Sequence, residues 1–399
     1  MQRTPSSIRP HVILLGRRNV GKSSLLNAIA KQPIALVSDV PGTTTDPVKK
    51  PYELLPFGPV VFLDTAGLDD IGPLGELRVK RTLEHVKQAD VGILVIEAGQ
   101  WGEFEEEALK KLKKQELPYI TVVNKTDEKP DWKAPIDAFY VSAETDKGIE
   151  DMRWELVKKL RSLGETNPTI IGDIVNAGDF VLLVVPIDLE APKGRLILPQ
   201  VMTIRDILDH DAISIVSKER ELFSTIRQLG RKPDLVICDS QVVLKVVGDV
   251  PSDIRMTTFS IIFAKLKGDL RKFVEGAAII DKLEDGDKVL ISEACSHHTV
   301  ADDIGGIKIP RWIRQYTGKE LHFDKVQGKN YPENLEEYRL IIHCGACMLT
   351  PKMMCARIDE ADTRSVPITN YGVAISYVHG VLHRVLSPFP YLQEIISYN

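Results

Sequence analysis

The stretch Gly16-Arg-Arg-Asn-Val-Gly21-Lys22-Ser23 is the feature that most limits what this chain can fold into. It fits the phosphate-loop pattern, in which four residues separate two glycines and Lys-Ser follows. That pattern needs a strand before it and a helix after it. The apolar run 11–15 predicts the strand, and Leu25, Leu26 and Ile29 predict an amphipathic helix. The sequence therefore predicts a parallel α/β sheet with this loop at the carboxyl end of a strand.

Each residue type in the loop has a physical role. Glycines let backbone N–H groups close around phosphate oxygens, and the following helix N-terminus adds partial positive charge. Lys22 is expected to reach the β and γ phosphates, and Ser23 to bind Mg²⁺. The residues of this stretch expected to contact the nucleotide are Asn19, Val20, Gly21, Lys22, Ser23 and Ser24.

A second motif, Asp64-Thr-Ala-Gly67, directly follows the predicted strand 60–63. At that position Asp64 can hold Mg²⁺ through water, and Gly67 can donate its N–H to the γ-phosphate. Strands are also predicted at 91–96 and 119–123. The alternation of short apolar runs and amphipathic stretches predicts a doubly wound sheet.

Two further motifs select the base. In Asn124-Lys125-Thr126-Asp127 the Asp127 carboxylate can accept hydrogen bonds from the ring N–H and the exocyclic amine of guanine, a pair that adenine lacks. In Val141-Ser142-Ala143-Glu144 the N–H of Ala143 is placed to donate to the guanine carbonyl. The four motifs together predict a domain that binds GTP and hydrolyses it to GDP and phosphate.

The order and spacing of these motifs resemble the translation-factor-related GTPases. Pro41-Gly42-Thr43-Thr44-Thr45-Asp46 resembles the switch segment of their Era/MnmE branch. This resemblance implies that one threonine contacts Mg²⁺ or the γ-phosphate. Thr44 is assigned to Mg²⁺, with Thr43 and Thr45 as alternatives, and the catalytic set becomes Lys22, Thr44, Asp64 and Gly67.

The resemblance also implies that Asn19 helps to hold K⁺ beside the phosphates. A monovalent cation would supply charge that an arginine finger supplies elsewhere. Leu68 stands where many signalling GTPases have the glutamine that orients the attacking water. We therefore expect slow hydrolysis that is faster with K⁺ than with Na⁺.

With 399 residues the chain is too long for one ordinary core, and three domains are predicted. They are a GTP-binding domain (1–165), a middle domain (166–256) and a C-terminal domain (257–399). The predicted fold class is α/β, with an N-terminal P-loop GTPase sheet followed by two smaller α/β domains. Beyond the first domain, strands are predicted at 180–187, 212–216, 235–238, 288–292 and 339–342, and helices at 218–229, 260–283, 312–316 and 373–385.

The five cysteines form an odd number in a chain with no apolar signal core, which favours thiol or metal chemistry over a disulfide framework. Cys295-Ser-His297-His298 and His343-Cys344-Gly-Ala-Cys347 each follow a predicted strand. The two-residue gap lets Cys344 and Cys347 reach one metal, and Gly345 is expected to permit the turn. Three thiolates with nearby imidazoles suit Zn²⁺ as Cys₃His, or a 4Fe-4S cluster with one other ligand.

Cys-x-His, 45 residues and His-Cys-x-x-Cys, placed after an Era-like GTPase, resemble the HydF family of FeFe-hydrogenase maturation GTPases. The resemblance implies a dimeric scaffold or carrier with a dimerisation domain (166–256) and a 4Fe-4S domain (257–399). Such a protein receives a diiron precursor made with two radical-SAM maturases and passes it to the apo-hydrogenase. Cys295, Cys344 and Cys347 become the cluster thiolates. His343 or His297 is the implied fourth ligand, with His298, Asp302 and Asp303 nearby.

Other tempting residues are predicted to be structural. Cys238 lies in an apolar run and is expected to be a packed core thiol, and Cys355 is a minor cluster candidate. His379 and His383, four apart in the predicted terminal helix, would share a face as a packed or solvated pair rather than a metal site. The charged runs 103–107 and 110–114 are predicted to be solvated helix faces.

The formal charge of -5 and a pI near 6.0 argue against a nucleic-acid partner, and the absence of a long apolar run argues against a membrane span. The cytoplasm is the expected location. Apolar strands of the middle domain would pair with a second copy or be buried internally. Two alternative functions remain: a ribosome- or RNA-associated GTPase with a C-terminal zinc module, and a GTP-driven metallochaperone for another metalloenzyme.

Overall fold

The computed structural model divides the chain into two compact units, 1–167 and 168–399. It describes residues 9–32, 48–65, 82, 85–163, 169–186, 196–294, 303–328 and 330–397. Both units are α/β, and their sheets are parallel except for one strand. The predicted fold class is confirmed.

The first unit is built on one six-stranded sheet in the order β2-β3-β1-β4-β5-β6, in which only β2 is antiparallel to its neighbour. All four predicted strands are present with boundaries within two residues of those expected. The edge strand β2 escaped prediction because its sequence, Val-Lys-Lys-Pro-Tyr-Glu-Leu, has no apolar run, as is usual at an exposed edge. The strands are β1 (His11–Leu15), β2 (Val48–Leu54), β3 (Gly58–Asp64), β4 (Val91–Glu97), β5 (Tyr119–Asn124) and β6 (Phe139–Tyr140).

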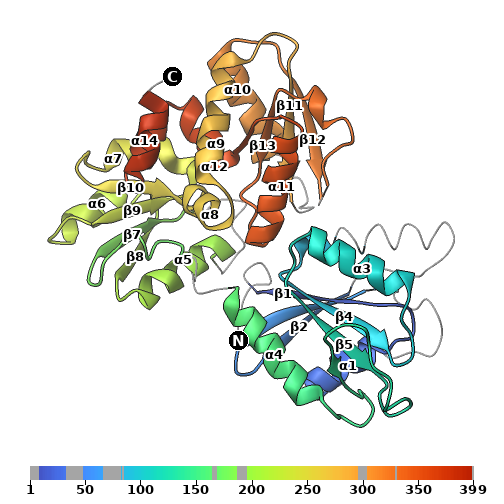
Figure 1. The fold of residues 1–399 in the computed structure, drawn as a ribbon. Coiled ribbons are helices and arrows are strands. Elements are labelled where there is room, and N and C mark those ends of the chain that lie inside the picture. Colours follow the sequence, from blue (N-terminus) through green and yellow to red (C-terminus); the bar gives the residue numbers. More distant parts are fainter. Residues whose placement is uncertain are drawn as a thin grey trace. The chain divides into compact units, whose positions relative to one another are not determined.

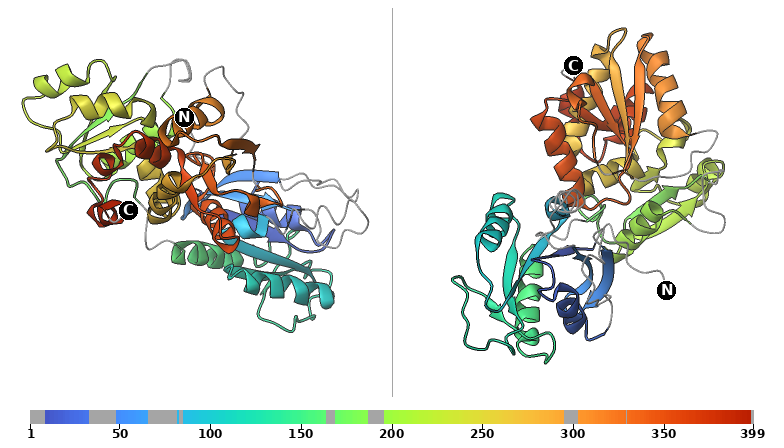
Figure 2. Two further views of the ribbon diagram at one scale, coloured as in Figure 1. Left: turned by 90° about the horizontal axis from the view of Figure 1, so that it is seen from above. Right: turned by 90° about the vertical axis from the view of Figure 1, so that its right-hand side faces the viewer.

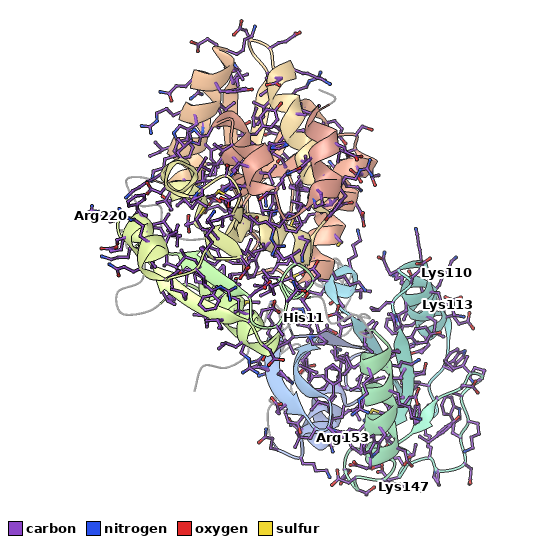
Figure 3. The ribbon with its side chains drawn as sticks, turned by 90° about the vertical axis from the view of Figure 1, so that its left-hand side faces the viewer. His11, Lys110, Lys113, Lys147, Arg153 and Arg220 are labelled. Atoms are coloured by element: carbon purple, nitrogen blue, oxygen red, sulfur yellow. The ribbon has the colours of Figure 1, made fainter. Side chains whose placement is uncertain are left out.

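Helices cover both faces of this sheet (Figure 1). α1 (Lys22–Ala30) and α4 (Ile149–Ser162) bury their apolar residues against one face, and α3 (Glu103–Lys114) packs on the other. The outer side of α3 carries exposed lysines, two of which, Lys110 and Lys113, project from it in Figure 3. The predicted solvated face at 110–114 therefore holds for its lysines, whereas Leu112 among them is buried.

The second unit begins with a four-stranded parallel sheet in the order β10-β9-β7-β8. Three of its strands were predicted, whereas β10 was not, and it runs two residues past the predicted boundary at 256. Its strands and helices are β7 (Phe180–Val184), α5 (Leu198–Asp209), β8 (Ile213–Ser217), α6 (Leu222–Gln228), β9 (Leu235–Cys238), α7 (Val243–Asp249) and β10 (Arg255–Thr258).

A second parallel sheet follows in the order β12-β11-β13-β14. Helices lie on both of its faces (Figure 2). Its strands are β11 (Lys288–Glu293), β12 (His322–Gln327), β13 (Leu340–His343) and β14 (Ile368–Asn370). The helices of this region are α8 (Phe259–Lys267), α9 (Leu270–Ala277), α10 (Ile309–Thr317), α11 (Pro351–Thr363), α12 (Tyr371–Val378), α13 (Leu382–Val385) and α14 (Pro390–Ser397).

The two sheets of the second unit share one continuous hydrophobic core. The end of the chain also returns to the first of them. The N–H of Met256 in β10 donates to Ser387 Oγ at 3.0 Å, and Arg384 Nη2 donates to the carbonyls of Pro251 and Ile254. The two predicted C-terminal domains therefore pack as one compact body, and the domain boundary at 256 stays a prediction.

Two predicted helices are wrong. The expected helix 260–283 is broken after Lys267, because Asp269 caps a new helix by accepting a hydrogen bond from Lys272 N. The expected terminal helix 373–385 is interrupted: α12 ends at Val378, Gly380 has φ of 69°, and the separate helix α13 begins at Leu382.

The second break also separates the two histidines that were expected to share a helix face. His379 follows α12 as its C-cap residue, and His383 belongs to α13. The ring of His379 packs edge-on against Trp312, with centroids 5.0 Å apart. His379 is therefore a packing residue. None of the helices in the described ranges is long and apolar enough to cross a bilayer.

Candidate nucleotide site and cysteine centre

The phosphate loop connects β1 to α1, as its pattern predicts. Two of its residues are constrained: Gly16 has no room for a side chain, and Asn19 has a left-handed backbone conformation. A Cβ at Gly16 would lie 2.4 Å from the carbonyl oxygen of Val95, and Asn19 has φ of 63°, a left-handed value that asparagine tolerates. The loop is thus pressed against β4, the neighbour of β1, and its shape is set by backbone contact.

Lys22 begins α1, and its side chain folds back over the loop. Its ammonium donates to the carbonyl of Gly16 at 3.1 Å and to that of Arg17 at 2.7 Å, and the side chain is buried. A buried ammonium held on loop carbonyls is placed to add a phosphate oxygen as a further acceptor. This position agrees with the predicted phosphate role.

Ser23, in the first turn of α1, meets Asp64 at the carboxyl end of β3. Ser23 Oγ donates to Asp64 Oδ2 at 2.8 Å, and β1 pairs with β3 through Leu14 and Asp64. Burial raises the pKa of Asp64, although the Ser23 hydrogen bond and the charges of Lys22 and Lys50 oppose that shift. A hydroxyl and a carboxylate are the oxygen donors that Mg²⁺ prefers, so the pair fits that ion. Thr44 and Gly67 lie outside the described residues.

Asn124, at the end of β5, joins three of the motifs. Its Nδ2 donates to the carbonyl of Val20 at 2.9 Å, and its Oδ1 accepts from the N–H of Ala143 at 3.0 Å. A Cβ at Gly21 would lie 2.3 Å from Asn124 Nδ2, so the second loop glycine is needed for this approach. The N–H of Ala143 has a protein acceptor here, and its role toward guanine stays a prediction.

The other residues predicted to contact the base surround Asn124. Asp127 presents an exposed carboxylate, and Lys125 takes φ of 59° with its ammonium 3.3 Å from Glu97 Oε1. Ser142 is wholly buried, and its Oγ accepts from Thr145 N at 3.2 Å. The buried hydroxyl shapes the turn, while the exposed carboxylate is the group available to a base.

One residue of the nucleotide site was missed by sequence reasoning. Glu105, in the run predicted to be a solvated face, is only 3% exposed. It accepts two hydrogen bonds from the Arg17 guanidinium, at 2.6 and 2.9 Å, and Arg17 also lies over the ring of Phe104 at 4.8 Å. The prediction for 103–107 is wrong at this position. The only available signal was Arg17 itself, a cation inside a phosphate loop.

The cysteine region is built at the carboxyl ends of β11 and β13, which pair through Ser292 and His343. The N–H of Cys344 donates to the carbonyl of Ser292 at 2.9 Å, and the N–H of Ala294 donates to Cys344 Sγ at 3.3 Å. Cys295 follows Ala294 in the sequence but lies outside the described residues. The peptide that leads to Cys295 therefore contacts the Cys344 thiol.

The turn between Cys344 and Cys347 differs from the expected one. Gly345 is not left-handed, whereas Ala346 has φ of 51°, an unusual value for alanine. Burial raises the pKa of Cys344, the N–H groups of Ala294 and Ala346 oppose this shift, and Cys347 adds to it. The expected role of the glycine is wrong, and the strained position is the alanine next to Cys347.

The side chain of Lys267 binds the backbone of this turn. Its side chain is 2% exposed, and its ammonium donates to the carbonyls of Ala346 at 2.8 Å and Cys347 at 2.9 Å. Burial lowers the pKa of Lys267 to about 8, against the opposing effect of the Cys347 and Cys344 thiols. Nothing in the sequence indicated this contact, because Lys267 lies 79 positions before Ala346.

His343, one implied fourth ligand, is wholly buried. Its Nδ1 lies 2.8 Å from the carbonyl oxygen of Cys344, and Nε2 has no hydrogen-bond partner among the described residues. Burial and the nearby Arg357 lower the pKa of His343 to about 3, so the ring stays neutral. Within the ranges that the structure describes, no three His, Cys, Asp or Glu side chains gather as a metal site. The ligand role of His343 stays a prediction.

Of the remaining candidates for the fourth cluster ligand, the structure describes only Asp303. His297, His298 and Asp302 lie outside the described residues. Asp303 accepts from Gly306 N at 2.9 Å and pairs with Lys325 at 2.6 Å, so it is used in holding its own turn.

The two other cysteines, Cys238 and Cys355, are not part of the turn that carries Cys344 and Cys347. Cys238 is wholly buried in the core, as predicted, and burial raises its pKa. Cys355 is exposed on α11, and its thiol lies 3.8 Å from the carbonyl of Lys267.

The fold and site of the first unit define a P-loop GTPase. Family models then account for most of the chain. The 50S ribosome-binding GTPase model matches residues 11–125, the hydrogen maturase F dimerization domain matches 170–268, and the hydrogen maturase F tetramerization domain matches 271–388. The chain belongs to the hydrogen maturase F (HydF) family. Two matched domains named for dimerization and tetramerization support an oligomeric protein.

Curated relatives match only the GTPase part. The tRNA modification GTPase MnmE of Nitrosomonas eutropha is 37% identical over 155 residues, covering 37% of this chain and 34% of that protein. GTPase Der of Campylobacter concisus is 34% identical over 158 residues, covering 37% and 34%. The chain spans about a third of the length of these relatives.

Solved structures give slighter likenesses. Aquifex aeolicus Era bound to GDP.AlF4- is 18% identical, covers 55% of this chain and 98% of that chain, and has a TM-score of 0.33. The G domain of the T. maritima FeoB iron transporter is 24% identical, covers 38% and 99%, and has a TM-score of 0.30. Likenesses at this level carry no argument about function.

The exposed carboxylate of Asp127 gives the first prediction. Asp127→Asn is expected to weaken GTP binding by about 100-fold or more, because hydrogen bonds to a charged group contribute about 1.5–3 kcal/mol each. ATP binding should stay weak. Calorimetric titration with both nucleotides measures this, with the exposed Asp131→Asn on the same loop as the control. An unchanged GTP affinity would contradict the assignment.

The Arg17–Glu105 pair gives the second. Glu105→Gln removes the bidentate charge-assisted contact and is expected to lower the free energy of unfolding by about 1–3 kcal/mol. GTP binding should weaken several-fold, since the Arg17 carbonyl also holds Lys22. Denaturant unfolding and GTP titration are the measurements, and Glu106→Gln, at an exposed neighbour, is the control. Equal effects of the two substitutions would show that the pair has no special role.

Proposed function

We propose that this chain is a GTPase of hydrogenase maturation that holds a 4Fe-4S cluster and a diiron precursor and delivers the precursor to the apo-hydrogenase. The observation that carries the proposal is the contact between Cys344 Sγ and the peptide that precedes Cys295. It supports convergence of the two cysteine groups after adjacent strands. Membership of the hydrogen maturase F family favours this function over an RNA-associated GTPase with a zinc module.

In the GTPase unit, binding and orientation are divided among a few side chains. Lys22 neutralises the phosphates, while Ser23 and Asp64 hold Mg²⁺. Thr44 would bind Mg²⁺, Gly67 would donate its N–H to the γ-phosphate, and Asp127 would select guanine. Leu68 offers no group to orient water. K⁺ beside Asn19 would supply positive charge to balance the negative charge that develops on the phosphates, so hydrolysis would be slow without it and faster with it.

The residues of the cysteine centre fit an iron–sulfur cluster. Cys344 and Cys347 supply two thiolates from one turn, and Cys295 supplies the third. N–H donation to sulfur, as from Ala294 to Cys344, is one of the means by which proteins tune such clusters. A cluster held by these three thiolates would have one iron with an exchangeable fourth ligand, at which a diiron fragment could bind. His343 and His297 are the proposed candidates for that fourth position.

The proposed assembly is a homodimer paired along β8. This strand is at the edge of its sheet, and Ile213 and Val216 on it are 43% and 47% exposed. An edge strand with exposed apolar side chains is a surface for pairing with another strand. By resemblance to the family, the other partners are two radical-SAM maturases, which supply the diiron precursor, and the apo-hydrogenase, which takes it.

Cluster binding is tested by substitution of the cysteines. Cys344→Ser and Cys347→Ser are each expected to lose most of the iron, the visible absorption and the EPR signal after anaerobic reconstitution. Cys355→Ser, at an exposed cysteine, is the control and should load as wild type. A colourless wild-type protein that holds zinc would overturn the cluster assignment and favour the zinc-module alternative.

The cation dependence is tested by measuring GTP hydrolysis of the full chain in the absence of partner proteins. Wild-type hydrolysis is expected to be several-fold faster in KCl than in NaCl at equal ionic strength. Asn19→Gly removes the side chain at a position whose φ of 63° glycine accepts, and should remove most of this difference. A K⁺ effect of full size in the variant would remove Asn19 from the role.

Dimer formation is tested at the β8 edge. Ile213→Lys with Val216→Lys is expected to shift the protein toward the monomer in light-scattering chromatography, because lysines on an edge strand oppose pairing with another strand. Leu244→Lys, at a 51% exposed leucine on α7, is the control. An unchanged mass for the double variant would place the interface elsewhere.

A further inference from the structure

Lys267 is a buried cation in the part of the chain that the structure describes. Packing alone does not explain why a charged side chain lies there. Its side chain is almost fully enclosed at the end of α8, yet its hydrogen bonds go to two carbonyl oxygens, of Ala346 and Cys347. No carboxylate within the described ranges forms an ion pair with it. Burying a charge is unfavourable unless an opposite charge compensates.

The groups around its ammonium indicate where the compensation comes from. Both carbonyls belong to the turn that carries Cys344 and Cys347, so the ammonium lies against the backbone that positions the two thiols. The ring of Phe263, 5.6 Å away, supplies only a cation–π contact. Thiolates that bind a metal centre are the anions this site offers.

The same contacts act on the shape of the turn. Ala346 has a left-handed φ of 51°, which alanine adopts only when its surroundings impose it. Lys267 binds the carbonyl of this residue and of the next one, so it fixes the two peptides on which Cys347 depends. Lys267 thus supplies a positive charge and also restricts the backbone geometry of the turn.

Lys267 also links two parts of the chain. It lies within 170–268, the match to the dimerization domain, whereas Ala346 and Cys347 lie within 271–388, the match to the tetramerization domain. The first of these regions therefore supplies a cation to the cysteine turn of the second.

We propose that Lys267 is a positioning residue of the cysteine centre, which fixes the turn of Cys344 and Cys347 and provides the buried positive charge that sets the reduction potential of the bound cluster. This inference rests on the proposed 4Fe-4S function. A nearby positive charge favours the more negative, reduced cluster, so its loss makes reduction harder.

The test compares three substitutions in the full-length protein. Lys267→Met keeps the length of the side chain without its charge, Lys267→Arg keeps the charge, and Lys282→Met removes an exposed lysine as the control. In redox titrations followed by EPR, Lys267→Met is expected to shift the midpoint potential to a more negative value. Lys267→Arg should lie closer to wild type, and Lys282→Met should match it. A Lys267→Met potential equal to that of wild type would overturn the proposal.

A second measurement covers variants that load no cluster. Hydrogen exchange of the apo protein is expected to be several-fold faster over residues 344–350 in Lys267→Met, and unchanged in Lys282→Met. If Lys267→Met fails to load and its exchange equals that of wild type, the proposal is overturned. Failure of wild type to load would instead count against the cluster function, and the exchange comparison would still decide whether Lys267 holds the turn.

Discussion

Parallel pairing of neighbouring strands is the constraint on which both sites depend. In the first unit it places the ends of β1 and β3 together, so that Ser23 and Asp64 meet. In the second unit it places the ends of β11 and β13 together, so that the peptide before Cys295 reaches the Cys344 thiol. Residues far apart in the chain become neighbours because parallel strands end at the same edge.

Both sites also use a lysine in the same way. Lys22 and Lys267 are each buried, and each donates to two carbonyl oxygens of a tight turn. In each case the turn belongs to the binding site for an anionic group, a nucleotide in the first unit and, as proposed, a thiolate-bound cluster in the second. Carbonyl groups keep the cation desolvated and oriented without neutralising it, which leaves its charge available to the ligand.

The sequence predicted what is local and missed what is distant. The motif residues from Gly16 to Ser23 and the buried strands were recognisable because their patterns are complete within a few positions. The contact of Glu105 with Arg17 could not be recognised in the sequence. It joins residues 88 positions apart, and Glu105 stands among charged residues that face solvent. The helix breaks at Asp269 and Gly380 had local signals, a capping residue and a glycine, which the apolar pattern on either side obscured.

The return of the C-terminal segment to β10 has a consequence for how this part of the chain can exist. Ser387 and Arg384 bind backbone groups of 251–256, and one core joins both sheets of the second unit. A polypeptide ending near 268 would leave β10 and α8 without the apolar residues that cover them. The region matched by the dimerization model therefore shares its core with residues more than a hundred positions later, and we expect its stability, and that of any dimer built on it, to depend on them.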